Sequence, residues 1–126
     1  MNIEQFVMGY LTAMLWAETD EDGDPLDCKY SVDDIASETR TDHTVICQKF
    51  AEANLKHLEA HIAIIEPWQD WTPSAIAGYD LWLTRNHHGA GFWDRGTGEH
   101  GDALTVAANL LGESHPYVDG GKVLTD

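Results

Sequence analysis

The segment from Asp80 to Gly96 contains the densest group of side chains that could bind a ligand. It holds two of the three arginines, two adjacent histidines, three glycines and two tryptophans. Guanidinium groups bind anions, aromatic rings offer a stacking surface, and glycine allows a close approach to the backbone. These residue types predict a small-anion or nucleotide site. Its candidate ligand-binding residues are Arg85, Asn86, His88, Asp94 and Arg95.

The same segment also has a purely structural interpretation, which the composition of the chain favours. Large aromatic side chains in a hairpin usually belong to the core. Arg95 can pair with Asp94 or another carboxylate, and the glycines can serve turns and bulges. The excess of negative charge in the chain disfavours an anion site. Both interpretations stay open at the level of the sequence.

The seven histidines do not form a specific metal-binding pattern. Zinc accepts imidazole and carboxylate ligands, so His87 and His88 could join a nearby acidic residue. Adjacent histidines on a strand, however, point to opposite faces of the sheet. His57 and His61 are spaced to share one face of a helix, but that spacing alone is not specific. We expect no native metal site.

The acidic run from Glu18 to Asp24 matches a calcium-binding loop only in part. With Glu18 at position 1, Gly23 falls at position 6, as the EF-hand requires, but Lys29 falls at position 12, where a bidentate glutamate is needed. The chain also lacks a P-loop, a GxSxG nucleophile motif and a dinucleotide-binding fingerprint. No catalytic residue and no cofactor follow from the sequence, and a binding protein is favoured over an enzyme.

Acidic residues outnumber basic residues by 22 to 7, which gives a net charge of −15. A field of this sign repels nucleic acid and anionic membranes and attracts a basic protein surface, although the same charge can also serve solubility alone. We therefore expect a protein partner with a basic surface, no direct nucleic-acid binding and no membrane association. The candidate partner-binding acidic surface consists of Glu18, Asp20, Glu21, Asp22, Asp24, Asp27, Asp33 and Asp34.

Helical periodicity and capping signals predict the elements that position these groups. Apolar residues recur every three or four positions over 2–16, which predicts an amphipathic helix. A second long helix is expected between a cap at Thr41 or Asp42 and Pro67, with Cys47 buried on its apolar stripe. A Ser31–Asp34 capping box predicts a short helical turn at 32–37. Thr72-Pro73 predicts the start of a helix that stops at Gly78. A further helix is expected over 99–111, with Gly112 at its end.

Two hairpins are expected in the second half of the chain. The aromatic and apolar runs on either side of 86–89 predict one, and the runs on either side of Gly120-Gly121 predict another, smaller one. Together with the helices they predict one acidic α+β domain over 1–126. In it an antiparallel sheet of three or four strands carries three main helices on one face. The N-terminal apolar run follows Glu4 with no basic residue before it, so we expect a cytoplasmic protein without a signal peptide.

Residues 81–86 (LWLTRN) and 88–96 (HGAGFWDRG) resemble a segment found in a group of small acidic proteins encoded by bacteriophages and prophages. The likeness extends to 30–36 and 101–105 and covers most of the chain. Position 87 is histidine here and glycine in the family pattern, so a positive φ at that position would be strained. The resemblance implies a bacteriophage setting in the cytoplasm of a bacterial host, and it implies no mechanism.

Three functions are compatible with these features. The first, which we favour, is a phage accessory protein that binds and inhibits a host protein, such as a nucleic-acid-handling or defence protein, through a DNA-mimic-like acidic surface. The second is small-ligand or nucleotide binding by the 80–96 hairpin. The third is self-assembly through exposed tryptophans on an edge hairpin. The sequence leaves the oligomeric state open.

Overall fold

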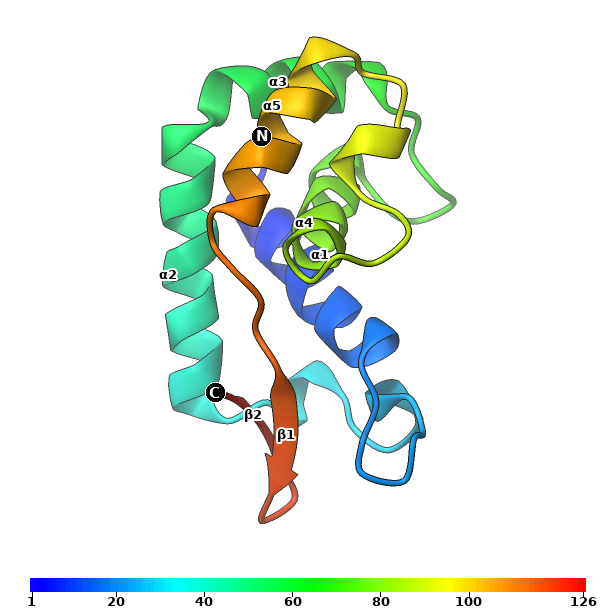
Figure 1. Ribbon diagram of the computed structural model, residues 1–126, viewed down its shortest axis with the longest axis vertical. Helices are drawn as coiled ribbons and strands as arrows, with labels where there is room; N and C mark the ends of the chain where they lie inside the picture. Colours follow the sequence, from blue (N-terminus) through cyan, green and yellow to red (C-terminus); the bar gives the residue numbers. More distant parts are fainter.

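Five α-helices and one two-stranded antiparallel hairpin make up the protein in a computed structural model that describes residues 1–126 (Figure 1). The α+β class is confirmed, but the sheet has two strands and not three or four. The elements are α1 (Ile3–Ala17), η1 (Leu26–Cys28), η2 (Val32–Asp34), α2 (Ser37–Ala53), α3 (Leu55–Ile64), α4 (Pro73–Arg85), η3 (Phe92–Asp94), α5 (Glu99–Asn109), β1 (Pro116–Asp119) and β2 (Lys122–Thr125), where η denotes a 3-10 turn.

Helices α1 and α4 cross at the centre of the molecule with their backbones in contact (Figure 1). A Cβ atom at Gly9 would overlap the carbonyl oxygen of Ala75, and a Cβ atom at Gly78 would overlap that of Phe6. Only glycine lets two helices approach this closely, because it has no side chain at the crossing. The prediction that Gly78 stops its helix was therefore wrong, since the residue is retained for packing inside α4.

The predicted hairpin over 80–96 is also wrong. Its first arm is the second half of α4, which continues to Arg85, and its second arm is η3. Every residue from Asp80 to Arg85 is buried, because other elements enclose this half of α4 on all sides. A helix buried all round shows a continuous run of large residues, and such a run has no periodicity that separates it from a buried strand.

The predicted second long helix is divided in two. Helix α2 begins at Ser37, earlier than expected, and Asn54 separates it from α3 with the non-helical angles φ −123° and ψ 20°. The Asn54 side-chain amide donates to the Phe50 carbonyl at 2.9 Å and so satisfies the end of α2. Figure 1 shows α2 upright on the left and α3 turned across the top of the molecule.

Local signals placed the remaining elements to within a few residues, although the turn expected over 32–37 covers only Val32–Asp34. Helix α1 starts at an Asn2 cap, η2 has the Ser31–Asp34 capping box, and α4 starts at Thr72. The small hairpin forms as predicted, with Gly120 and Gly121 both at positive φ in its turn. It lies at one end of the molecule, where Ile35 bridges to Val123, so the helices pack on one another and not on a sheet face (Figure 1).

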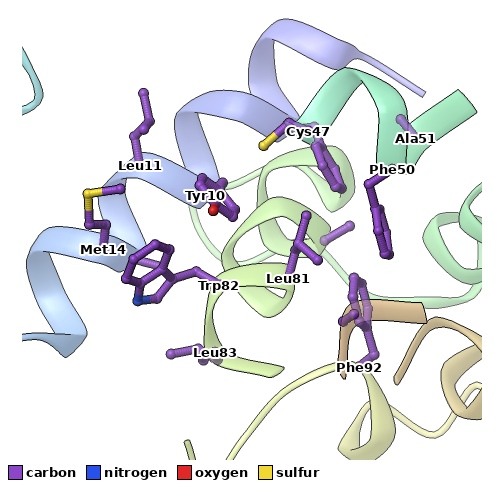
Figure 2. Close-up of a cluster of buried hydrophobic side chains, with 14 of the residues drawn as sticks. Tyr10, Leu11, Met14, Cys47, Phe50, Ala51, Leu81, Trp82, Leu83 and Phe92 are labelled. Atoms are coloured by element: carbon purple, nitrogen blue, oxygen red, sulfur yellow. The ribbon is translucent and has the colours of Figure 1, made fainter. Parts of the chain in front are cut away.

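Three phenylalanines connect the central pair of helices to the rest of the core. Phe50 of α2 stacks between Phe6 of α1 and Phe92 of η3, at centroid distances of 6.4 and 6.0 Å. Figure 2 shows Phe50 above Phe92, and Trp82 on the other side of the core beside Tyr10. Cys47 is buried there, as predicted, and both cysteines of the chain are free thiols. None of the helices is long and apolar enough to cross a lipid bilayer.

Replacement of Gly78 by alanine should destabilise the protein by about 3 kcal/mol or more, because α1 and α4 must then separate. Gly89→Ala is the matched control, since a Cβ atom there meets nothing within 4 Å. Urea denaturation followed by circular dichroism measures both changes. Equal stability of the two variants would show that the helices do not depend on this contact.

Candidate functional site

Arg85, the first of the predicted ligand-binding residues, is buried and holds the end of another helix. Its Nε donates to the carbonyl of Gly112 at 2.8 Å, and its Nη2 donates to that of Leu111 at 3.3 Å. These carbonyls lie just beyond the C-terminus of α5, where the helix dipole is negative and a guanidinium is favourable. Its remaining amino group, Nη1, donates to the Tyr10 hydroxyl at 2.9 Å. All three groups of this arginine are thus used inside the protein.

The Arg85 contact begins a buried polar chain that ends at the last strand. Because the Tyr10 hydroxyl accepts from Arg85, its own proton goes to His43 Nδ1, 2.7 Å away. His43 Nε2 therefore carries the ring proton and donates to Thr125 Oγ1 at 2.9 Å. Burial, and then the positive charge of Arg85, lower the pKa of His43 to about 4. The ring is neutral at physiological pH and joins α1, α2 and β2.

Asn86 and His88, two further predicted ligand-binding residues, are also bound within the chain. Asn86 Nδ2 donates to the Trp82 carbonyl at 3.1 Å, and its Oδ1 accepts from the Ser114 N–H at 2.8 Å. His88 Nε2 lies 2.6 Å from Glu18 Oε2, which also accepts from Trp82 Nε1 at 2.9 Å. Glu18 therefore fixes the loop after α4 and is mostly withdrawn from the acidic surface.

His87, between these two residues, has a φ of +59°. This is a backbone conformation that glycine adopts without strain and that other residues adopt less readily. The side chain is exposed, so the histidine has room in this unfavourable conformation.

Arg95 and Asp80 form a bidentate ion pair in which the carboxylate is buried. Two parallel bonds, at 2.8 and 2.7 Å, join Arg95 Nε and Nη2 to the two oxygens of Asp80, whose side chain is completely buried. The guanidinium also stacks on Trp68, 4.3 Å from the ring centroid. Asp94 accepts from the Gly91 N–H at 3.2 Å and closes the turn of η3. None of the five predicted ligand-binding side chains lines a principal surface cavity.

The acidic loop after α1 is organised by one aspartate and one lysine. Asp20 Oδ1 accepts the N–H groups of Asp22 and Asp24 at 2.9 and 3.0 Å. Lys29 Nζ lies 2.9 Å from Asp20 and 3.6 Å from each of the other two carboxylates. The hydrogen bond from Lys29 lowers the pKa of Asp20. These three aspartates are also the one group of three potential metal ligands, within 4.8 Å of one another.

The rest of the predicted acidic surface follows along the same loop. Glu21, Asp27 and Asp33 are exposed, and Asp34 is half-buried in the η2 capping box. Arg40 of α2 approaches Asp33 at 3.9 Å and leaves that carboxylate 93% exposed. A shallow hollow separates the loop from the hairpin, lined among others by Asp22, Lys29 and Tyr117.

Three histidines lie where α3 packs against α5 and the segment before it. His57 Nδ1 lies 3.0 Å from His100 Nδ1, so one ring donates to the other. His61 is fully buried, its Nδ1 lies 2.8 Å from Thr97 Oγ1, and its Nε2 has no hydrogen-bond partner. Burial, followed by the charges of Arg95 and His100, lowers the pKa of His61 to about 4. His57 and His61 have different partners, since His57 contacts His100 inside α5 and His61 contacts Thr97 just before that helix.

A surface cluster of aromatic side chains around Tyr79 was not predicted from the sequence. Trp16, Trp68 and Trp71 lie 5.7, 6.1 and 5.6 Å from the Tyr79 ring, centroid to centroid. The rings come from the end of α1, from the 68–71 turn and from the middle of α4. The two tryptophans three residues apart after Pro67 were the available signal, but their proximity to Trp16 depends on the crossing of α1 and α4.

Asp80→Asn should destabilise the protein by about 3–5 kcal/mol, because it leaves the Arg95 guanidinium partly buried without a counter-ion. Asp94→Asn is the matched control, and we expect a loss below about 1 kcal/mol, because that carboxylate is exposed and accepts one long bond. Chemical denaturation at pH 7 measures both. A loss for Asp80→Asn no larger than that of the control would contradict the assignment.

Because His43 and His61 are buried with lowered pKa values, we expect the free energy of unfolding to fall as the pH is lowered from 6.5 to 5. The unfolded chain binds protons at His43 and His61 in this range, whereas the folded chain binds them only near pH 4. The free energy of unfolding should drop by at most about 2 kcal/mol for each histidine. His43→Gln should halve the drop, and His115→Gln, at an exposed position, should not change it. Denaturation series at several pH values provide the measurement, and an unchanged drop in His43→Gln would refute the assignment.

The candidate site residues divide into a buried and a solvent-facing group. Those of the 80–96 segment hold helices, turns and the ion pair in place, whereas the acidic loop and the aromatic cluster face solvent. Comparisons of the chain with protein-family models, with curated protein sequences and with solved structures find no match.

Proposed function

We propose that this chain is an accessory protein of phage origin that binds and inhibits a host protein through its acidic surface. The observation that supports the proposal best is the distribution of charge between surface and interior. Eighteen of the 22 acidic residues are exposed, and Asp80 alone is buried. A surface of this kind attracts and orients a basic partner over a long range.

The basic residues strengthen the imbalance, because four of the seven are engaged in contacts within the chain. Arg85 and Arg95 are occupied by buried contacts, and Lys29 and Arg40 lie against carboxylates of the acidic loop. The other three basic residues are Lys49, Lys56 and Lys122, which are exposed on α2, α3 and β2. The protein therefore has little positive charge to offer an anion.

The acidic loop is suited to a partner because its backbone is held in one conformation. Asp20 accepts hydrogen bonds from the backbone of the loop itself. Asp22, Asp24 and Asp27 are exposed to solvent. A loop that is already ordered loses less conformational entropy on binding. Proteins that handle nucleic acid, including many host defence proteins, carry Lys and Arg surfaces that neutralise phosphates. Such a surface is the proposed target, with carboxylates in the place of phosphates.

The geometry favours this function over small-ligand binding by the 80–96 segment. Each of the five candidate side chains there is engaged in a contact within the chain, and none lines a principal cavity. A ligand that used them would have to break the Asp80–Arg95 pair or the contacts that hold α5.

The test is retention of a bacterial nucleic-acid-handling protein on the immobilised protein. We expect retention at low salt, release at high salt, and competition by added duplex DNA. Salt anions, DNA and this protein would all compete for the same basic surface of the partner. The pair Asp22→Lys and Asp33→Lys should weaken retention about tenfold or more. The pair Glu52→Lys and Glu59→Lys is the control, since it changes the net charge equally at exposed helical positions. Salt-independent binding, or equal losses in the two pairs, would refute the proposal.

A further inference from the structure

Four aromatic rings, two exposed and two half-buried, form a surface cluster where α1 lies beside α4. Tyr79 is at its centre and contacts Trp16, Trp68 and Trp71. The exposed fraction is 57% for Trp16 and 40% for Trp68, although both are among the largest apolar side chains. Exposed tryptophan and tyrosine side chains that gather in one place are typical of the centres of protein interfaces.

The two tryptophans of the 68–71 turn are held in place by the backbone. The Trp68 N–H donates to the Trp71 carbonyl at 3.1 Å, and the Trp71 N–H donates to the Trp68 carbonyl at 2.6 Å. Gln69 inside this turn has a φ of +46°, so the tight turn is kept despite an unfavourable conformation. The two rings lie 6.5 Å apart, centroid to centroid, on a turn whose backbone is already ordered.

The surroundings of the cluster are acidic. Glu66 precedes the turn, Asp70 lies inside it between the two tryptophans, and both are exposed. Burial, followed by the negative charge of Asp80, raises the pKa of Tyr79 to about 12, and Asp27 adds to the effect. Trp16 lies at the end of α1, directly before the acidic loop, so the loop and the aromatic cluster adjoin. An aromatic centre with a charged rim is the usual construction of a protein interface.

One cation already occupies this cluster, and it shows which group the rings accept. The Arg95 guanidinium lies 4.3 Å from the centroid of Trp68, over its face. A planar guanidinium stacks on an aromatic ring and loses hydration more readily than an ammonium group does. The exposed ring of Trp16 has no such partner within the chain.

We propose that the aromatic cluster of Trp16, Trp68, Trp71 and Tyr79 binds arginine side chains of a basic protein partner by stacking. This inference rests on the proposed function and names the side chains that the acidic surface selects. The carboxylates of Asp27, Glu66 and Asp70 supply the attraction, and the rings supply a preference for arginine over lysine. A second copy of the chain is a poorer occupant, because two surfaces from proteins of charge −15 repel each other.

The experiment uses two fluorescein-labelled peptides of equal length and charge, one of alternating arginine and serine and one of alternating lysine and serine. Fluorescence anisotropy at physiological salt gives the dissociation constant of each with the full-length protein. We expect the arginine peptide to bind at least about threefold more tightly. Trp16→Ala should remove this preference, and Trp93→Ala should keep it, since Trp93 is similarly exposed, at 50%, and lies outside the cluster.

Circular dichroism confirms that each variant is folded, and Trp68→Ala provides a second variant within the cluster. Equal binding of the two peptides to the wild-type protein overturns the inference and leaves the proposed function standing. Loss of the preference in Trp93→Ala to the same extent as in Trp16→Ala also overturns it. Failure of both peptides to bind counts against the proposed function itself. A concentration-dependent dimer that Trp16→Ala abolishes in sedimentation would assign the cluster to a second copy instead and overturn the inference.

Discussion

The contact between the backbones of α1 and α4 is the constraint on which the rest of the structure depends. Gly9 and Gly78 remove the side chains at the crossing, so the two helices lie closer than any other pair of residues would allow. This proximity places α4 in the middle of the molecule and helps to bury its second half, from Asp80 to Arg85, on all sides. It also brings Tyr10 within reach of Arg85, and Trp16 within reach of Tyr79. The internal polar chain and the exposed aromatic cluster both follow from one crossing.

The burial of α4 explains how a chain with so few basic residues uses them. A charged group in the interior must be paired or fully hydrogen-bonded, since the loss of hydration is otherwise too costly. Arg85 meets this requirement with two carbonyl groups and a hydroxyl, and Arg95 meets it with Asp80. The acidic residues have no comparable internal role, so nearly all of them remain in water. The fold therefore turns an excess of carboxylates into an acidic exterior.

The surface combines an ordered acidic loop with an adjoining aromatic cluster. The acidic loop is ordered by its own aspartate and lysine, and the aromatic cluster next to it is ordered by the 68–71 turn and by Tyr79. Charge acts over a long distance and guides a partner towards the surface, whereas stacking acts only at contact and distinguishes one basic side chain from another. The two features together can provide both attraction and selectivity.

Much of the local structure was determined by the sequence itself. The helix over 3–17, the Ser31–Asp34 capping box, the Thr72-Pro73 helix start and the Gly120-Gly121 hairpin depend on neighbouring residues, and the structure has them where the sequence predicts them. The charge of −15, and with it the expectation of a basic partner, also requires no fold.

Only the tertiary structure decided the conformation of the 80–96 segment and the places of its side chains. Leu81, Trp82 and Leu83 fit a strand or a buried helix equally well, and the choice depended on what surrounds them. Gly78 ends a helix by local rules, and it continues one here because α1 packs against it. Asp80 meets Arg95 fifteen residues further along the chain, and Trp16 of α1 meets Tyr79 of α4. Sequence patterns report interactions between near neighbours, whereas these contacts depend on how the helices and turns pack on one another.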